Sequence, residues 1–190
     1  MTNPAKTGVP EIVVHIDGAS RGNPGPSACA VVMESAGGSP LAAFSKFLGK
    51  ATNNFAEYHA LLAALEYAVS HQQRRIRVLT DSELLARQIT GQYKVKHAAL
   101  KPLHEQARRL IARLEGFSIE HVPREQNRQA DLLVNQALDA ARAGPGRPAA
   151  PVPGPLRTSA TYQKGILKPY QQLPLEEGEE VEVEIRRKEH

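Results

Sequence analysis

The chain of 190 residues has one cysteine, no tryptophan and few aromatic residues. A single cysteine excludes an internal disulfide framework and fits a reducing compartment, so we expect Cys29 to be a buried packing residue. No stretch approaches the ~20 apolar residues that are needed to span a bilayer. The segment 1–10 also lacks the apolar core of a signal peptide. These absences argue against a secreted disulfide scaffold and a membrane protein, and they predict a cytoplasmic protein.

Charge is distributed unevenly along the chain. The formal net charge is +4, and the segment from Arg147 to the end contains seven basic and seven acidic residues. The whole positive excess therefore lies in the first part, with 17 basic and 13 acidic residues. This excess favours a polyanionic partner, although ordinary solubilisation of the surface explains it equally well.

Hydrophobic periodicity predicts one α/β domain over residues 11–142. Alternating apolar residues indicate strands, and apolar residues three or four apart indicate helices. We expect strands at 11–18, 27–35, 41–49, 74–82 and 117–122, and helices at 52–72, 83–91, 97–116 and 127–144. The order predicts a five-stranded mixed sheet flanked by helices, with the strand at 74–82 parallel to and beside the strand at 11–18.

Two short segments flank this domain, and a linker joins it to a small module. Residues 1–10 are expected to form an N-terminal tail, and residues 143–155 a linker rich in Pro, Gly and Ala. Residues 156–190 contain a hairpin-like TYQKGILK and an alternating VEVEI. They predict a small β-rich module with too few apolar residues to be stable alone, so it should dock or dimerise.

Four carboxylates stand at the ends of predicted elements. Asp17 and Asp81 end two neighbouring strands, Glu57 lies in the first turns of a helix, and Asp131 lies in the first turn of the last helix. Each alone has a structural explanation, such as a favourable interaction with the helix dipole. If all four meet at one edge of the sheet, however, they repel one another unless a divalent cation neutralises them.

An all-oxygen ligand set favours Mg²⁺ or Mn²⁺ over zinc. A pair of such ions ~4 Å apart supports in-line displacement at phosphorus, that is, phosphodiester hydrolysis. No Ser-His-Asp or Cys-His spacing competes with this interpretation, and DGASRGNPGP lacks the lysine of a phosphate-binding P-loop.

Four sequence blocks resemble type 1 ribonuclease H: DGASRGNPGPSA, TNNFAEYHALLAAL, TDSELLARQITG and HVPREQNRQADLLVNQAL. The resemblance covers about residues 11 to 142 in the family's order. It implies a ribonuclease H catalytic domain that cleaves the RNA strand of RNA–DNA hybrids and leaves 3′-hydroxyl and 5′-phosphate ends. It also implies two Mg²⁺ ions per site, with Mn²⁺ as an alternative, held by Asp17, Glu57, Asp81 and Asp131.

The same resemblance implies a set of substrate-binding residues. Within the Gly-Asn-Pro-Gly loop, Gly22 and Asn23 would contact the hybrid, and Asn23 would hold a DNA phosphate together with Thr52. Asn53 and Asn54 would face the minor groove, where contacts to 2′-hydroxyls distinguish RNA from DNA; helix capping is the simpler alternative for both. Three further positions that match the family pattern shape the RNA side or the last loop: Ser82, Glu83 and Asn127.

Two departures from the family pattern are visible. The loop VPREQN lacks the histidine of many bacterial members, so Arg124 is the candidate for a compensating catalytic role at the scissile phosphate or its product. His121 before this loop is expected to pack on its strand. The basic protrusion is also missing, which leaves Lys94, Lys96 and Lys101 as a weaker contact to DNA phosphates. Compact members of this kind imply double-stranded RNA as a second, weaker substrate.

The C-terminal module resembles a small β family that is sometimes labelled antitoxin-like. The match rests on the residues Tyr162, Gly165, Leu167, Lys168, Pro169, Leu175, Glu177, Gly178, Val181, Val183 and Ile185. The resemblance implies a homodimer or protein contact through this module, not catalysis.

Two other functions compete with a ribonuclease. The first is a hybrid-binding module without catalysis, or an assembly scaffold built around the tail; the binding module would not need acids at all four positions. Another nuclease of the same fold, such as a resolvase or a 3′ exonuclease, would not need the Gly-Asn-Pro-Gly and Thr-Asn-Asn blocks. The sequence therefore favours a metal-dependent endoribonuclease.

Overall fold

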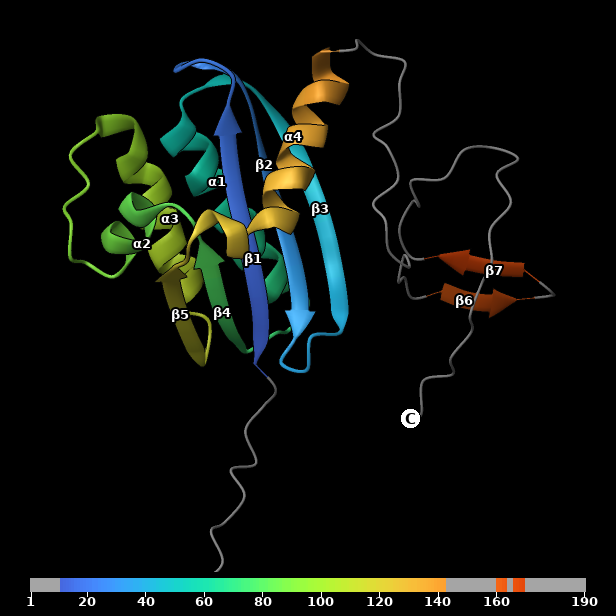
Figure 1. The fold of residues 1–190 in the computed structure, drawn as a ribbon. Helices are drawn as coiled ribbons and strands as arrows, with labels where there is room; N and C mark the ends of the chain where they lie inside the picture. Colours follow the sequence, from blue (N-terminus) through green and yellow to red (C-terminus); the bar gives the residue numbers. More distant parts are fainter. Residues whose placement is uncertain (1–10, 143–159, 164–165, 170–190) are drawn as a thin grey trace, which may run out of the picture. The chain divides into compact units, whose positions relative to one another are not determined.

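The computed structural model describes residues 11–142, 160–163 and 166–169 (Figure 1). The chain forms two compact units, Met1–Gly154 and Pro155–His190. The elements of the first unit are β1 (Ile12–Ser20), β2 (Gly25–Ser35), β3 (Pro40–Ala51), α1 (Asn53–Ser70), β4 (Arg75–Thr80), α2 (Glu83–Ile89), the 3₁₀ helix η1 (Ala98–Leu100), α3 (Lys101–Ile111), β5 (Gly116–His121), the 3₁₀ helix η2 (Arg124–Gln126) and α4 (Arg128–Arg142).

The five strands form one mixed sheet in the order β3-β2-β1-β4-β5, which confirms the predicted fold class. β2 is antiparallel to both β1 and β3, whereas β4 is parallel to both β1 and β5. In the β1–β4 register, Ile16 lies opposite Thr80. The next residues, Asp17 and Asp81, therefore lie at the same level of two neighbouring strands. Asp81 follows the last residue of β4, whereas β1 continues to Ser20, so the prediction that Asp17 ends its strand is wrong.

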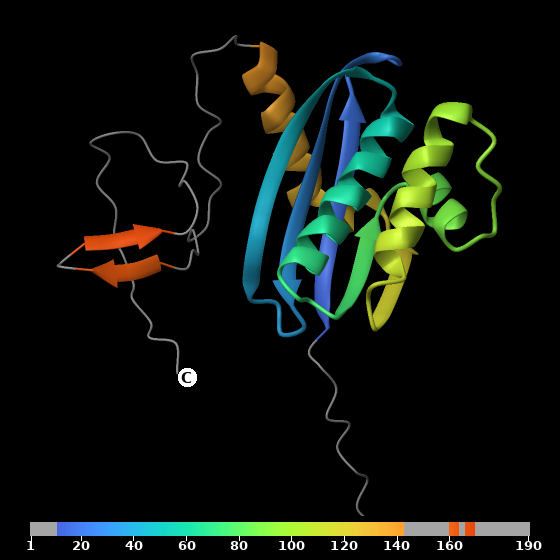
Figure 2. The same cartoon turned by 180° about the vertical axis from the view of Figure 1, so that it is seen from behind.

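Helices cover both faces of the sheet (Figures 1 and 2). α1 packs on one face, where Val14 and Ile16 of β1 meet Leu61 and Leu65 in the larger hydrophobic cluster. α4 covers the other face and buries its apolar stripe against short side chains of β2, including Ala30. The stripe consists of Ala130, Leu133, Val134, Ala137 and Leu138.

The predicted helix over 97–116 is wrong in its extent. Residues 98–100 form the separate turn η1, α3 covers only 101–111, and Gly116 opens β5 instead of ending the helix. Pro102 explains the late start, because a residue without a backbone N–H is tolerated only in the first helical turn. The expectation for Cys29 is confirmed, since the thiol is free and buried in the core.

The second unit contains an antiparallel pair, β6 (Ala160–Gln163) and β7 (Ile166–Pro169), in which Thr161 lies opposite Lys168. This pair confirms the predicted hairpin TYQKGILK. The predicted tail 1–10, the linker 143–155 and the strand VEVEI lie outside the described residues. In the described part of the chain, no helix combines the length and the apolar character that crossing a membrane requires.

A close backbone contact fixes the distance between β1 and α1. A Cβ atom added to Gly18 would lie 2.2 Å from the backbone carbon of Ala56 and 2.2 Å from the backbone nitrogen of Glu57. Backbone atoms cannot move aside like the end of a flexible side chain. Glycine at this position therefore lets the strand that carries Asp17 lie directly against the helix turn that carries Glu57.

Replacing this glycine should separate the two elements. We expect Gly18→Ala to lower the free energy of unfolding by about 1–3 kcal/mol, the usual cost of overpacking a core. Urea denaturation of the variant and the wild type measures this difference.

Gly37→Ala is the matched control, because a Cβ there would meet only the Ser35 hydroxyl, at 3.8 Å. It should leave stability within about 0.5 kcal/mol, as surface substitutions usually do. Equal stability of the two variants would refute the assignment of Gly18 as the close contact.

Candidate active site

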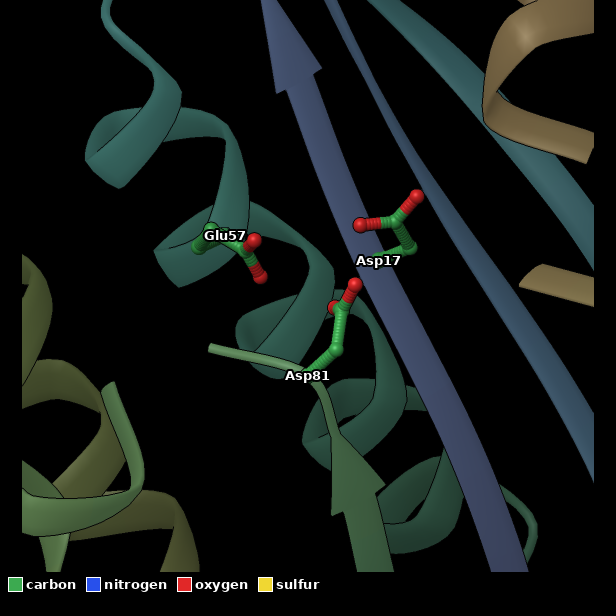
Figure 3. A group of neighbouring side chains, drawn as sticks. All are labelled: Asp17, Glu57 and Asp81. Atoms are coloured by element: carbon green, nitrogen blue, oxygen red, sulfur yellow. The ribbon is translucent and has the colours of Figure 1, made fainter. Parts of the chain in front are cut away.

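Three carboxylates from three elements point toward one another (Figure 3). Asp17 belongs to β1, Glu57 to α1, and Asp81 follows the last residue of β4. One carboxylate oxygen from each lies within 4.8 Å of the others, a separation at which a single cation can contact all three. The structure thus brings together three of the four acids that the sequence singles out.

Local hydrogen bonds hold the segments that carry these acids. The Thr52 hydroxyl caps α1 by accepting a hydrogen bond from the backbone N–H of Phe55 at 3.3 Å, which sets the start of the helix just before Glu57. On the other side, the Thr80 hydroxyl accepts from the backbone N–H of Ser82 at 3.1 Å. This bond spans Asp81 and fixes the turn between β4 and α2.

Burial and mutual repulsion disfavour the ionised forms of two of these acids. The pKa of Asp17 rises to about 7, mainly because of burial and then because of the nearby charges of Asp81 and Asp131. The pKa of Glu57 is raised well above its ordinary value by burial, and then by Asp17 and Asp81. The backbone N–H of Gly18 opposes both shifts with hydrogen bonds, but it does not cancel them.

The three acids fit a hard divalent cation. Oε2 of Glu57 is buried and has no hydrogen-bond partner among the described residues, and such an unpaired oxygen is costly unless a ligand meets it. The donor set is entirely carboxylate oxygen, which suits Mg²⁺ or Mn²⁺ and not zinc. The residues present therefore fit the metal that the sequence predicts.

The fourth acid, Asp131, lies outside this group of three. Its Oδ1 accepts a hydrogen bond from Nε of Arg124 at 3.2 Å and also contacts Nη2 of the same guanidinium. Asp131 is nevertheless close enough to raise the pKa of Asp17. Arg124 thus pairs with a candidate ligand. His121, which precedes the loop VPREQN, is exposed, so the expected packing on its strand is wrong.

Asn127 connects the start of α4 to the centre of the sheet. Its side chain is fully buried, and Nδ2 donates to the backbone oxygen of Ile16 at 2.8 Å and to Oδ1 of Asp81 at 3.4 Å. The backbone oxygen of Asn127 accepts from the N–H of Asp131 at 3.1 Å, so the residue stands at the cap position of α4. Its side chain, however, positions Asp81 instead of capping the helix.

The β1–β2 loop and the start of α1 are joined by a pair of asparagines. Oδ1 of Asn23 accepts from the backbone N–H of Asn53 at 3.3 Å, and Oδ1 of Asn53 accepts from the N–H of Ser20 at 3.2 Å. Gly22 in the same loop has φ +103°, which explains why glycine stands there.

Beside this junction lies a cavity of about 540 Å³ whose lining includes Asn23, Thr52 and Asn54. The cavity also includes two residues that the sequence analysis missed, Lys50 and His97. The lysine stands two residues before Thr52 and could have been suspected, whereas the local sequence of His97 gives no signal.

The remaining predicted residues lie further along the surface. The Ser82 hydroxyl accepts from the N–H of Leu85 at 3.4 Å and so caps α2, on which Glu83 is exposed. Lys94 lines a second cavity, of about 450 Å³, together with Lys101 and Arg108. Lys96 is exposed outside that lining.

The raised pKa of Asp17 makes stability depend on pH in the absence of metal. The folded protein keeps this proton up to about pH 7, whereas the unfolded chain releases it near pH 4. The resulting stability is fully present below pH 4 and is lost as the pH rises through 7. Between pH 5 and pH 8 in EDTA, the free energy of unfolding of the wild type should fall by about 2 kcal/mol relative to Asp17→Asn. Urea denaturation of both proteins tests this, and parallel pH profiles would contradict it.

The side-chain hydrogen bonds of Asn127 should contribute more to the free energy of unfolding than those of an ordinary helix asparagine. Asn127→Ala leaves the buried Ile16 carbonyl without this donor, and we expect a loss of about 1–3 kcal/mol in the free energy of unfolding. Asn135→Ala is the control, because Nδ2 of Asn135 bonds only to Asp131 O within the same helix, at 2.8 Å. Chemical denaturation should show the control within about 0.5 kcal/mol of wild type; similar losses in both variants would count against the positioning role.

Comparisons with known proteins agree with this geometry. The family profile described as "Reverse transcriptase-like" matches residues 15–137, and the profile "AF2212-like" matches residues 159–190. The second match says nothing of an antitoxin, so that part of the expected resemblance stays a prediction.

Two relatives illustrate the similarity. The "Bifunctional protein Rv2228c" of Mycobacterium tuberculosis is 44% identical over 132 residues, which are 69% of this chain and 36% of that protein. Ribonuclease HI of Halobacterium salinarum is 44% identical over 127 residues, 67% of this chain and 64% of that protein. The chain thus spans about a third of the first protein and just under two thirds of the second.

Solved structures show the same likeness over nearly the whole of shorter chains. RNase H1 of Halobacterium salinarum superposes with a TM-score of 0.67 at 42% identity, covering 68% of this chain and 98% of that one. LC11-RNase H1, isolated from compost and solved in complex with an RNA/DNA hybrid, gives a TM-score of 0.66 at 39% identity over 69% and 99%. With this fold, this acid cluster and these relatives, the chain belongs to the ribonuclease H family, and the family profile matches its residues 15–137.

Proposed function

We propose that this chain is a metal-dependent endoribonuclease that hydrolyses the RNA strand of RNA–DNA hybrids to 5′-phosphate and 3′-hydroxyl ends. The observation that carries the proposal is the group of Asp17, Glu57 and Asp81, with a buried, unpartnered oxygen on Glu57. A binding module would not need three acids in one place, because repulsion and desolvation make them costly. The hybrid bound to LC11-RNase H1 supports the choice of substrate.

The acids divide between two divalent cations. Asp17 would contact both ions, Glu57 and Asp81 would complete one site, and Asp131 would contribute to the other. When bound, Mg²⁺ or Mn²⁺ would activate the attacking water and neutralise charge on the leaving 3′ oxygen. Asn127 acts as a positioning residue, since it holds Asp81 against β1.

The cavity beside Asn23 would hold a phosphate of the DNA strand. Asn23 and Thr52 offer polar groups there, and Lys50 adds a positive charge. Positive side chains that hold phosphates position a duplex without reading its sequence. This arrangement supports cleavage with little dependence on sequence.

Preference for RNA would come from the start of α1. Asn54 lines the cavity, whereas the side chain of Asn53 bonds to Ser20 N at 3.2 Å, so Asn54 is the freer of the two to meet the minor groove. Ser82 and Glu83 would border the RNA side. Because double-stranded RNA also presents 2′-hydroxyls, it would be a weaker second substrate.

Basic residues beyond the site would contribute general affinity. Lys94, Lys96 and Lys101 would contact DNA phosphates in place of the missing protrusion. Few such contacts predict weak binding that falls further with added salt. The module at 156–190, joined by the linker 143–155, would form a homodimer or bind another protein. The protein would act in the cytoplasm.

Removing a metal ligand should abolish cleavage. On a labelled duplex with a few ribonucleotides flanked by DNA, the wild type should cut only at the ribonucleotides in Mg²⁺ or Mn²⁺. Asp17→Asn and Glu57→Gln should lose about 10³-fold or more in rate, because metal catalysis supplies several kcal/mol of transition-state stabilisation. Gel analysis of the products measures both position and rate.

Glu66→Gln is the matched control, because Glu66 is an exposed acid of the same helix, α1, and it should cleave like the wild type. All-DNA and all-RNA duplexes test whether cleavage is specific for the hybrid. A wild type that binds the hybrid but cuts nothing with either metal would replace the proposal with the binding-module alternative. Cutting within the all-DNA duplex would favour a different nuclease of this fold.

A further inference from the structure

The four acids of the site differ in their partners. The side chains of Asp17, Glu57 and Asp81 already face one another, whereas the carboxylate of Asp131 is paired with the Arg124 guanidinium. Both Nε and Nη2 of Arg124 approach the same oxygen, Oδ1. A positive charge therefore already sits on the one acid that would complete a second cation site.

The pair is placed where it can be exchanged. The Arg124 side chain is 70% exposed and that of Asp131 is 28% exposed. Exposed ion pairs of this kind contribute little to stability, so another anion can take the guanidinium at little cost.

The backbone on either side of the pair is anchored. The N–H of Val122 donates to the Thr80 oxygen at 2.9 Å, and Asn127 is fully buried. Arg124 lies between these anchors on η2, so its long side chain can move while the loop and the start of α4 stay in place.

The charges around Arg124 favour this position in the free protein. Its pKa is raised first by the hydrogen bond and charge of Asp131 and then by Asp17 and Asp81. Arg124 in turn opposes the upward shift of the Asp17 pKa. In the free protein the guanidinium thus supplies part of the positive charge that a second divalent cation would supply.

We propose that Arg124 blocks Asp131 as a metal ligand until nucleic acid binds. A backbone phosphate of the bound hybrid draws the guanidinium away from Asp131, and the freed carboxylate then becomes available to the second cation. Arg124 is a positioning residue in this scheme, because it controls a ligand by occupying it. The scheme deepens the proposed function and rests on it for the identity of the polyanion.

The first test counts bound Mn²⁺ on the full chain without nucleic acid, by electron paramagnetic resonance of the free ion. The wild type should bind one ion tightly and a second weakly. Arg124→Gln should tighten the second by about fivefold to tenfold, since it removes a competing ion pair and a repelling charge. Adding Asp131→Asn to Arg124→Gln should abolish that gain.

Arg74→Gln is the matched control. Arg74 also forms an exposed ion pair, with Glu115 at 2.8 Å, and its loss changes the net charge equally. It should leave both Mn²⁺ affinities unchanged. Equal gains in the Arg74 and Arg124 variants would reduce the effect to net charge and overturn the proposal.

The second test adds a polyanion. A hybrid of DNA with a 2′-O-methyl RNA strand, at a concentration shown to be saturating by fluorescence anisotropy, should tighten the second Mn²⁺ in the wild type but not in Arg124→Gln. Two equally tight ions in the free wild type would overturn the proposal, and so would an Arg124 variant identical to the wild type. Because Mn²⁺ binding is read without cleavage, a failure of the proposed catalysis remains distinguishable from a failure of this inference.

Discussion

The backbone contact between β1 and α1 at Gly18 is the constraint on which the rest of the site depends. β1 is held on both sides, antiparallel to β2 and parallel to β4, so it cannot yield to the helix. α1 is held at its start by the Thr52 cap and by the bond from Ser20 N to Asn53. Between two fixed elements, a residue without a side chain lets Asp17 and Glu57 come close enough to share one ligand.

This closeness has an electrostatic cost. Burial raises the pKa of both Asp17 and Glu57, and nearby carboxylates add to it: Asp81 acts on both residues, and Asp17 acts on Glu57. The molecule can lower that cost with a proton or with a cation. The two hydrophobic clusters on opposite faces of the sheet hold the acids in place in either state, since neither cluster contains a charged residue. Packing in the two clusters therefore stabilises the fold against the destabilising effect of the buried acids.

The sequence predicts the fold well because its signals are local. Alternating residues define β1, periodic apolar residues define α4, and an acid within an apolar strand draws attention to Asp17. Pro102 could have corrected the start of α3, because a proline inside a helical pattern indicates a boundary.

Other features depend on the fold in three dimensions. Asn127 and Ile16 are 111 residues apart, so their hydrogen bond has no local signature. Arg124 and Asp131 are near in sequence, but the direction of a long exposed side chain is set by the charges around it and not by spacing. His97 and Lys50 line the same cavity because η1, which follows His97, lies against α1.

Burial decides which of the positive charges at this site can be exchanged. Glu57 is 4% exposed, and an unpaired oxygen there can be met only by a small ion that fits between packed elements. Asp131, at the rim, is reached by a guanidinium on a flexible chain that solvent can also accommodate. A buried acid thus demands a resident cation, whereas a rim acid can change partners when a phosphate arrives. Because the four acids span this range of burial, one compact site would, in the proposed scheme, hold its first cation firmly and take its second conditionally.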